Sequence, residues 1–295
     1  MPMTESVLLQ TPLGPPGSGR SRYGAAMALH LAGLISDRQL EIYRIASARD
    51  DANPETLFVD RGLPLPRVAA PDAAWLIRGL VVAADRYLAG LEQAPGVAEV
   101  RAGLAPWAAG PVMPPAAPAD PLVDPVPHPV VRAHLPRALE VAAATRPDLA
   151  AAIAAAAPHL RWQSYAGYDA QAIGAGFANG QAYALVVGEA SPIRARDFDL
   201  GLFLIAPHVL YRDHAHAAPE LYAPLTGPHG WRFGTEGPLQ LRPAHHPVWN
   251  PAHQPHLIKV GPEPYLCLYG WTRDVNAPAY ILPASDWPAL EALRL

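Results

Sequence analysis

The stretch YRDHAHAAPELY, residues 211–222, decides the expected fold, because it concentrates metal-binding side chains in one short segment. His214 and His216 are two residues apart, so on a β-strand both imidazoles project from the same face. The Ala-Ala-Pro sequence after them predicts a turn, and Glu220 then re-enters on an adjacent strand facing the histidines. Two neutral imidazoles and a carboxylate suit a divalent first-row metal and leave coordination positions open for water or substrate.

Histidines are concentrated around this stretch, since eight of the 12 lie between His208 and His256. A fourth ligand is expected from a distant strand. His256 is our choice, because a proline precedes it and a β-type run follows it. His253 stays open as the alternative fourth ligand, and an H-x-H pair on a surface strand is the alternative to a metal site.

The chain after Arg161 consists of short β-type runs punctuated by glycine and proline. These runs are residues 182–188, 200–206, 220–225, 257–260, 265–271 and 280–282. Short strands at this spacing predict a sandwich or barrel rather than a parallel α/β sheet.

The chain before the β-rich part has helical patterns and a proline-rich segment. Ser36 is placed to cap a helix, and residues 72–92 have the spacing of an amphipathic helix. Nine prolines fall within residues 106–129, a density that no regular element tolerates. The expected segments are a disordered N-terminus (1–20), a helical N-terminal region (21–105), a proline-rich connector (106–130) and a β domain with a helical flank (131–295).

Composition excludes several classes of function. The net charge is -4, and Lys259 is the single lysine, which argues against nucleic-acid binding through a basic face. One cysteine, Cys267, excludes an intramolecular disulfide framework. The chain has no apolar run long enough for a transmembrane helix, and we interpret residues 25–35 as a helix rather than a signal-peptide core. A cytoplasmic protein without membrane partners is therefore expected.

Two motifs resemble those of the cupin superfamily. His214-x-His216-x3-Glu220-x6-Gly227 is similar to the first cupin motif, and Pro251-x4-His256 is similar to the second. The resemblance implies a mainly β, cupin-type (double-stranded β-helix or jelly-roll) barrel with an α-helical N-terminal region. It also implies one divalent transition metal (Zn, Fe, Mn or Ni). The four ligands it implies are His214, His216, Glu220 and His256.

The sequence departs from the cupin pattern at four positions. Cupins usually carry glycine where this chain has His208, His245 and His253, and asparagine where it has Val260. These differences alter turn geometry but remove no ligand.

Within the cupins, residues 160–282 look most like the dimethylsulfoniopropionate (DMSP) lyases. The matching segments include Arg161-Trp162, Leu200-Gly201-Leu202, Tyr211-x2-His214-x-His216, Glu220-Leu221-Tyr222 and Leu268-Tyr269-x-Trp271-x-Arg273-Asp274. The resemblance implies metal-assisted β-elimination of DMSP, a small-molecule substrate, to dimethyl sulfide and acrylate.

Roles for the aromatic residues follow from that resemblance together with strand spacing. Tyr222 shares the strand face of Glu220, which makes its phenolate a candidate base. Tyr211 corresponds to a pocket tyrosine of the family, but strict alternation from His214 requires a bend at residues 212–213. Tyr269 and Trp271 share a face on the run 265–271, where an aromatic wall holds a sulfonium cation by cation–π attraction. Aromatic core packing is the alternative for this wall.

Two other classes of function stay open. One is a metal cupin enzyme, a dioxygenase or isomerase, acting on another small acid; Tyr222 favours proton abstraction over oxygen chemistry. The other is a non-catalytic cupin that senses a small molecule. The helical half is interpreted as a dimerisation or lid element, which leaves a homodimer open.

Overall fold

The computed structural model of the chain describes residues 13–31, 35–65, 73–108 and 128–295, which form two compact units with a boundary at Trp75. The first unit holds α2 (Ser18–Leu31), α3 (Asp37–Ala46) and α4 (Pro54–Asp60). Most of the predicted N-terminal segment 1–20 and of the predicted connector 106–130 lies outside the described residues. The start of α2 at Ser18 lies inside the segment 1–20.

The small helical unit confirms the predicted cap of its second helix. The Ser36 hydroxyl accepts a hydrogen bond from the Gln39 backbone N–H, while the Gln39 side chain accepts one from the Ser36 backbone N–H. This reciprocal capping box satisfies two backbone donors at the start of α3. Ile42, Tyr43 and Phe58 then form a small separate core.

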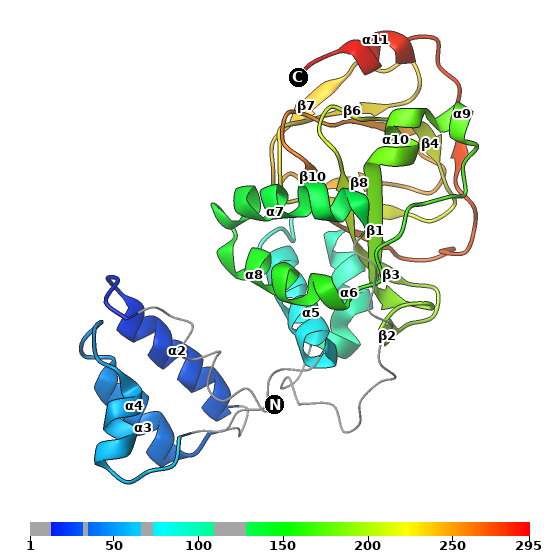
Figure 1. Cartoon of the computed structure of the whole chain (residues 1–295). Helices are drawn as coiled ribbons and strands as arrows, with labels where there is room; N and C mark the ends of the chain where they lie inside the picture. The colour runs from blue at the N-terminus through cyan, green and yellow to red at the C-terminus, as the bar shows by residue number, and fades with distance from the viewer. Residues whose placement is uncertain (1–12, 32–34, 66–72, 109–127) are drawn as a thin grey trace. The chain divides into compact units, whose positions relative to one another are not determined.

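The second unit contains the remaining helices and all the strands of the described residues (Figure 1). Its helices are α5 (Ala73–Ala89), α6 (Val97–Ala108), α7 (Pro129–Ala143), α8 (Pro147–Ala156), η1 (Ala157–His159), α9 (Ala170–Ile173), α10 (Ala175–Gly180) and α11 (Trp287–Ala292). Leu80 of α5 and Val100 of α6 belong to the core that the strands share. Helices from the predicted region 21–105 are therefore found in both units, because α5 and α6 bury their apolar faces against the sheet.

The strands form two sheets. They are β1 (Gln181–Gly188), β2 (Ile193–Arg194), β3 (Asp199–Ile205), β4 (Leu210–Ala215), β5 (Glu220–Pro224), β6 (His229–Phe233), β7 (Gln240–Arg242), β8 (Val248–Asn250), β9 (His256–Lys259), β10 (Tyr265–Trp271) and β11 (Tyr280–Ile281). One sheet has the order β2-β1-β3-β10-β5-β8 and the other β11-β4-β9-β6-β7. The described strands thus form the two-sheet, jelly-roll arrangement expected of a cupin-type fold, and these two sheets do not close into a barrel.

The six-stranded sheet has two different faces, because successive side chains of a strand point to opposite sides. On β3, Leu200, Leu202 and Leu204 point into the core with the helices. Asp199 and Phe203, which alternate with them, line a pocket on the other face. Figure 1 shows α5–α8 gathered on one side of the sheets. The pocket lies on the opposite face of the six-stranded sheet from the core that these helices share with it.

The turn after His216 connects the two sheets and does not form a hairpin. β4 pairs with β9 and β11, whereas β5 pairs with β10 and β8. The expectation that Glu220 lies on a strand adjacent to the histidine strand is therefore wrong. Glu220 faces the histidines from the opposite sheet, and this is how two sheets with facing inner surfaces enclose a site.

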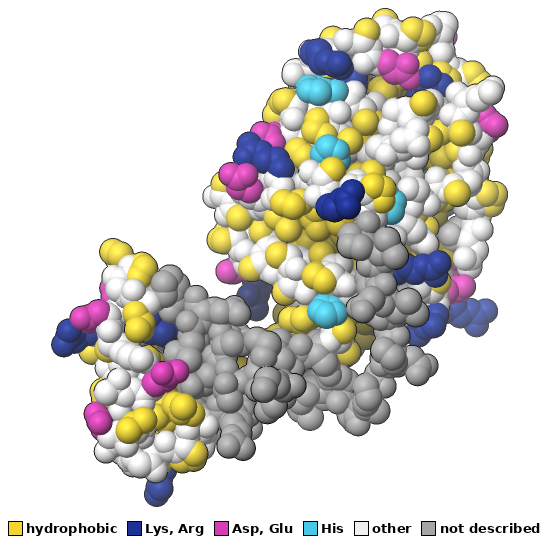
Figure 2. Space-filling model, viewed as in Figure 1, with side chains coloured by type: hydrophobic (Ala, Val, Ile, Leu, Met, Phe, Trp, Pro, Cys, Tyr) yellow, Lys and Arg dark blue, Asp and Glu magenta, His cyan; other side chains and the backbone are white. Residues whose placement is uncertain are grey.

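No helix among residues 13–31, 35–65, 73–108 and 128–295 is long and apolar enough to cross a bilayer. On the face that Figure 2 shows, basic and acidic side chains of the described residues are intermixed.

Candidate functional site

A bulge in β4 brings Tyr211 and His214 to the same side of the strand. The pairing of β4 with β9 shifts register between these two residues, so the strict alternation that would separate them is broken. Their rings stack with centroids 3.8 Å apart and an interplanar angle of 16°. The predicted bend at residues 212–213 is confirmed, and it places Tyr211 beside the histidines.

His214, His216 and His256 converge on one buried point. One ring nitrogen from each lies within 4.8 Å of the other two. In each ring Nδ1 donates to a backbone carbonyl: His214 to Arg212 at 2.9 Å, His216 to Ala218 at 2.7 Å and His256 to Gln254 at 2.8 Å. Because a carbonyl occupies Nδ1 of each ring, Nε2 is the nitrogen left to bind a metal, and Nε2 of His216 donates a hydrogen bond to the Glu220 carboxylate.

Glu220 completes the cluster from the facing sheet. Its Oε2 lies 2.9 Å from His216 Nε2 and 3.5 Å from His256 Nε2. Burial acts to raise the pKa of Glu220, but the two histidines outweigh burial and lower that pKa to about 2. The carboxylate is therefore ionised at the centre of the cluster.

The cluster leaves buried nitrogen atoms without partners. Nε2 of His214 and Nε2 of His256 are both inaccessible to solvent and make no hydrogen bond with the described residues. Buried polar atoms without partners cost free energy, and in native proteins they usually mark a missing ligand or ion. Burial and the two other histidines also lower the pKa of His214 well below its usual value, which keeps this ring neutral.

The alternative fourth ligand, His253, lies outside the histidine cluster. His253 is exposed, has a backbone φ of 61°, and its Nδ1 lies 3.3 Å from the Tyr280 hydroxyl. The geometry therefore favours His256 as the fourth member of the cluster.

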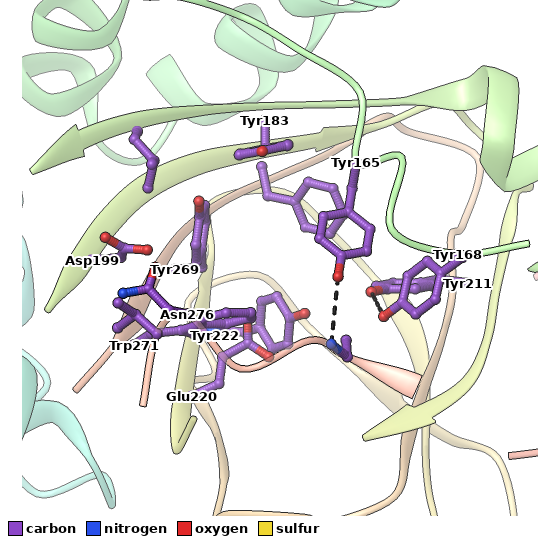
Figure 3. A pocket seen from close by; sticks show the side chains of 14 residues that line it. Tyr165, Tyr168, Tyr183, Asp199, Tyr211, Glu220, Tyr222, Tyr269, Trp271 and Asn276 are labelled. Atoms are coloured by element: carbon purple, nitrogen blue, oxygen red, sulfur yellow. Dashed lines mark hydrogen bonds between the residues drawn. The ribbon is translucent and has the colours of Figure 1, made fainter. Parts of the chain in front are cut away.

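A pocket of about 250 Å³ opens beside Glu220 (Figure 3). Most of its lining residues are aromatic, and the lining also includes two acids and one amide. The lining residues are Tyr165, Tyr168, Tyr183, Leu185, Asp199, Phe203, Tyr211, Glu220, Tyr222, Tyr269, Trp271, Val275, Asn276 and Ala279. An aromatic pocket with few polar groups is typical of a small-molecule site.

Strand register explains why four of the predicted residues share this pocket. Trp271 pairs with Glu220, and Tyr269 pairs with Tyr222, across β10 and β5. Directly paired residues project from the same face, so all four line the pocket. The Trp271 ring also lies against His216, with centroids 4.7 Å apart.

Tyr222 lies at the inner part of the pocket, close to the cluster. Its ring centroid is 6.0 Å from that of His256. Burial, followed by the Glu220 carboxylate, raises the pKa of Tyr222 well above its usual value in the metal-free chain. A nearby dication acts in the opposite direction, because positive charge favours the phenolate.

Sequence reasoning missed a second group of pocket residues. Tyr168 donates or accepts a 2.8 Å hydrogen bond with the Tyr211 hydroxyl, and the Tyr165 hydroxyl accepts one from the Ala279 backbone N–H at 3.4 Å. Tyr183 and Asp199 enter from β1 and β3. One feature of the sequence could have identified Asp199 as a pocket residue: it is an acidic residue at the start of an otherwise apolar strand.

The fold and the buried cluster define this protein as a cupin-type protein with a three-histidine, one-glutamate site. A sequence profile of the dimethylsulfoniopropionate lyase family matches residues 117–267, just over half of the chain. The chain therefore belongs to the DMSP lyase family, and this membership makes it a lyase. No curated protein sequence matches it significantly.

One solved structure shares the fold, and others are more distantly similar. A structure from work on the DMSP lyases RdDddP and RnDddQII has 19% identity and a TM-score of 0.50, covering 72% of this chain and 100% of that one. DddQ from Ruegeria pomeroyi DSS-3 has 18% identity, a TM-score of 0.46, and coverage of 69% and 95%. A cupin-like protein from Thermotoga maritima msb8 has 15% identity, a TM-score of 0.30, and coverage of 35% and 77%. The expected cupin-type fold is confirmed.

Proposed function

We propose that this protein uses a divalent transition metal to cleave the carbon–sulfur bond of DMSP, releasing dimethyl sulfide and acrylate. The observation that carries the proposal is the convergence of three imidazole Nε2 atoms and one ionised carboxylate beside an aromatic pocket. Membership of the DMSP lyase family supplies the substrate.

The proposed metal ligands are His214, His216, Glu220 and His256. The fit rests on the unpartnered Nε2 atoms of His214 and His256 and on the backbone hydrogen bonds that occupy Nδ1 of all three rings. When bound, a divalent transition metal supplies Lewis acidity that stabilises negative charge developing on the substrate carboxylate. Zinc, iron, manganese and nickel all accept this set of nitrogen and oxygen donors.

Tyr222 is the proposed catalytic base. It shares the face of Glu220 and lines the pocket, so its phenolate oxygen can take the proton from the carbon next to the substrate carboxylate. The electron pair of that C–H bond forms the new C=C bond. The C–S bond then breaks, and its electron pair leaves with sulfur, so that the cationic sulfonium becomes neutral dimethyl sulfide.

Tyr211, Tyr269 and Trp271 are the proposed substrate-binding residues. Tyr211 stacks on His214 and is held by Tyr168, which fixes its hydroxyl at the edge of the pocket. Tyr269 and Trp271 present aromatic rings on the same sheet face as Glu220, and a sulfonium group against these rings gains cation–π attraction.

Headspace analysis of the protein with DMSP tests the proposal. Metal-loaded protein is expected to release dimethyl sulfide and acrylate in equal amounts, and chelator-treated protein to release neither until metal is restored. Binding of DMSP without turnover by metal-loaded protein would instead support a small-molecule sensor. Oxygen consumption without dimethyl sulfide release would support a dioxygenase.

A further inference from the structure

Asp199 places an unpaired negative charge at one end of the pocket. This first residue of β3 is half-buried and lines the cavity. Its carboxylate makes no hydrogen bond or ion pair with the part of the chain that the structure describes. The charged groups acting on it, Glu189 and Asp197, are both acidic, and together with burial they raise the pKa of Asp199 to about 6. The site therefore lacks a cation.

The position of this carboxylate is built into the neighbouring strand end. Gly188 closes β1 with a φ of +154°, and a Cβ at this position would lie 2.2 Å from Asp199 Oδ1. Only glycine leaves room for the carboxylate there. The negative charge is therefore held at a defined place beside the cavity.

Asp199, Trp271 and Glu220 form a row across three adjacent strands. Trp271 of β10 pairs with Asp199 of β3 on one side and with Glu220 of β5 on the other. With strands about 4.8 Å apart, the Cα atoms of the two acids are roughly 10 Å apart, and the indole lies between them. In Figure 3, Asp199 lies with Tyr269, Asn276 and Trp271, away from the Tyr168–Tyr211 pair.

This row provides two chemically different ends for one small ligand. The end at Glu220 adjoins the histidine cluster, which suits a carboxylate through the proposed metal. The end at Asp199 combines an unpaired carboxylate with the rings of Tyr269 and Trp271, all on one sheet face. Weakly hydrated organic cations are recognised by this combination of aromatic faces and negative charge.

We propose that Asp199 is the anionic contact for the cationic group of the substrate and selects a zwitterion over a carboxylate that lacks the cationic group. The inference rests on the proposed function, whose substrate carries a sulfonium at one end and a carboxylate at the other. Asp199 thereby orients the substrate, with its sulfonium away from the histidine cluster.

The contact acts on the bound substrate more than on the transition state. The sulfonium loses its positive charge as the C–S bond breaks, so the attraction to Asp199 falls as the reaction proceeds. An interaction that is strongest in the ground state lowers KM without raising kcat. Neither acrylate nor neutral dimethyl sulfide retains the contact, which favours release of products.

A pair of unreactive isosteres tests the inference. 3-(Trimethylammonio)propanoate carries the cation, and 4,4-dimethylpentanoate has the same shape without it. Calorimetry on metal-loaded wild type should show tighter binding of the cationic compound. In Asp199→Asn its Kd should rise by about tenfold, the cost of losing one partly solvated charge contact, while the Kd of 4,4-dimethylpentanoate stays within about twofold. KM for DMSP should rise in parallel with kcat little changed.

The controls separate charge from shape. Glu236→Gln removes one exposed acid outside the pocket and should move neither Kd. Asp199→Glu keeps the charge and should retain the preference for the cation, and Asp199→Ser repeats the test if Asp199→Asn does not fold. Equal binding of the two isosteres by wild type, or equal weakening of both by Asp199→Asn, overturns the inference. Absence of dimethyl sulfide release by wild type overturns the proposed function alone, because the binding contrast does not depend on turnover.

Discussion

The two faces of the six-stranded sheet are built by the same strands but have opposite characters. Leu202 and Leu268 point toward the helices and are buried among leucine, valine and alanine. Their sequence neighbours Gly201, Phe203 and Tyr269 point the other way, where tyrosines and two acids surround a cavity. The face toward the helices therefore serves packing, and the face toward the cavity serves chemistry. Substitutions on the first face are expected to change stability, and substitutions on the second to change turnover.

The largest effect is expected at the histidine cluster. The double variant His214→Ala/Glu220→Ala removes a ligand from each sheet and should reduce bound metal from about one ion per chain to near zero and abolish turnover. Elemental analysis after dialysis measures this. His246→Ala, which removes an exposed histidine, is the control and should keep its metal. Stoichiometric metal in the double variant would contradict the site assignment.

Tyr222→Phe tests the chemical role of the pocket face with the smallest structural change. Loss of the hydroxyl keeps the ring's packing, so metal content and melting temperature should stay near wild type while kcat falls by about 10²-fold or more. Tyr280→Phe removes a hydroxyl from a tyrosine that is 43% exposed and should leave kcat unchanged. Full turnover in Tyr222→Phe would assign the base to another group, with Tyr211 the next candidate; loss of metal would make Tyr222 a ligand.

Leu202→Ala tests the packing face. The side chain is fully buried in the core with the helices, so its truncation should lower the free energy of unfolding by about 2–5 kcal/mol. Because Leu202 points away from the pocket, kcat of the folded variant should stay within about twofold of wild type. Denaturant unfolding and initial-rate assays measure the two quantities, and Leu241→Ala, at a side chain 61% exposed, is the stability control. A fall in kcat as large as the one predicted for Tyr222→Phe would show that the faces are not independent.

The smallest effect is a pH dependence at the outer end of the pocket. With a pKa of about 6, Asp199 is ionised above pH 6 and neutral below it. Affinity for the cationic isostere should therefore rise with pH, with a Kd at pH 5 about fivefold higher than at pH 8 if the neutral acid binds about tenfold more weakly. The same measurement with 4,4-dimethylpentanoate at both pH values corrects for titration of other groups. A pH dependence that persists in Asp199→Asn would assign it to another residue.

Local spacing predicted the features that lie within one strand or turn. The pair His214 and His216, the strand at residues 265–271 and the Ser36 cap depend on neighbours a few residues away, so their residue types suffice. His256 was chosen from the proline before it and the β-type run after it, and its likeness to the second cupin motif agreed with that choice. The roles of these residues, the oligomeric state and the domain boundaries stay predictions.

Contacts between distant segments were decided by the tertiary structure alone. Strand pairing places Asp199 opposite Trp271 although 72 residues separate them in sequence, and no local pattern encodes that register. The β4 bulge that brings Tyr211 onto His214 and the crossing of the chain from β4 to a strand in the other sheet likewise depend on which strands pair. Periodicity determines which side chains share a face of a strand, whereas burial of the apolar faces of α5 and α6 against the sheet determines which face is left to form the pocket.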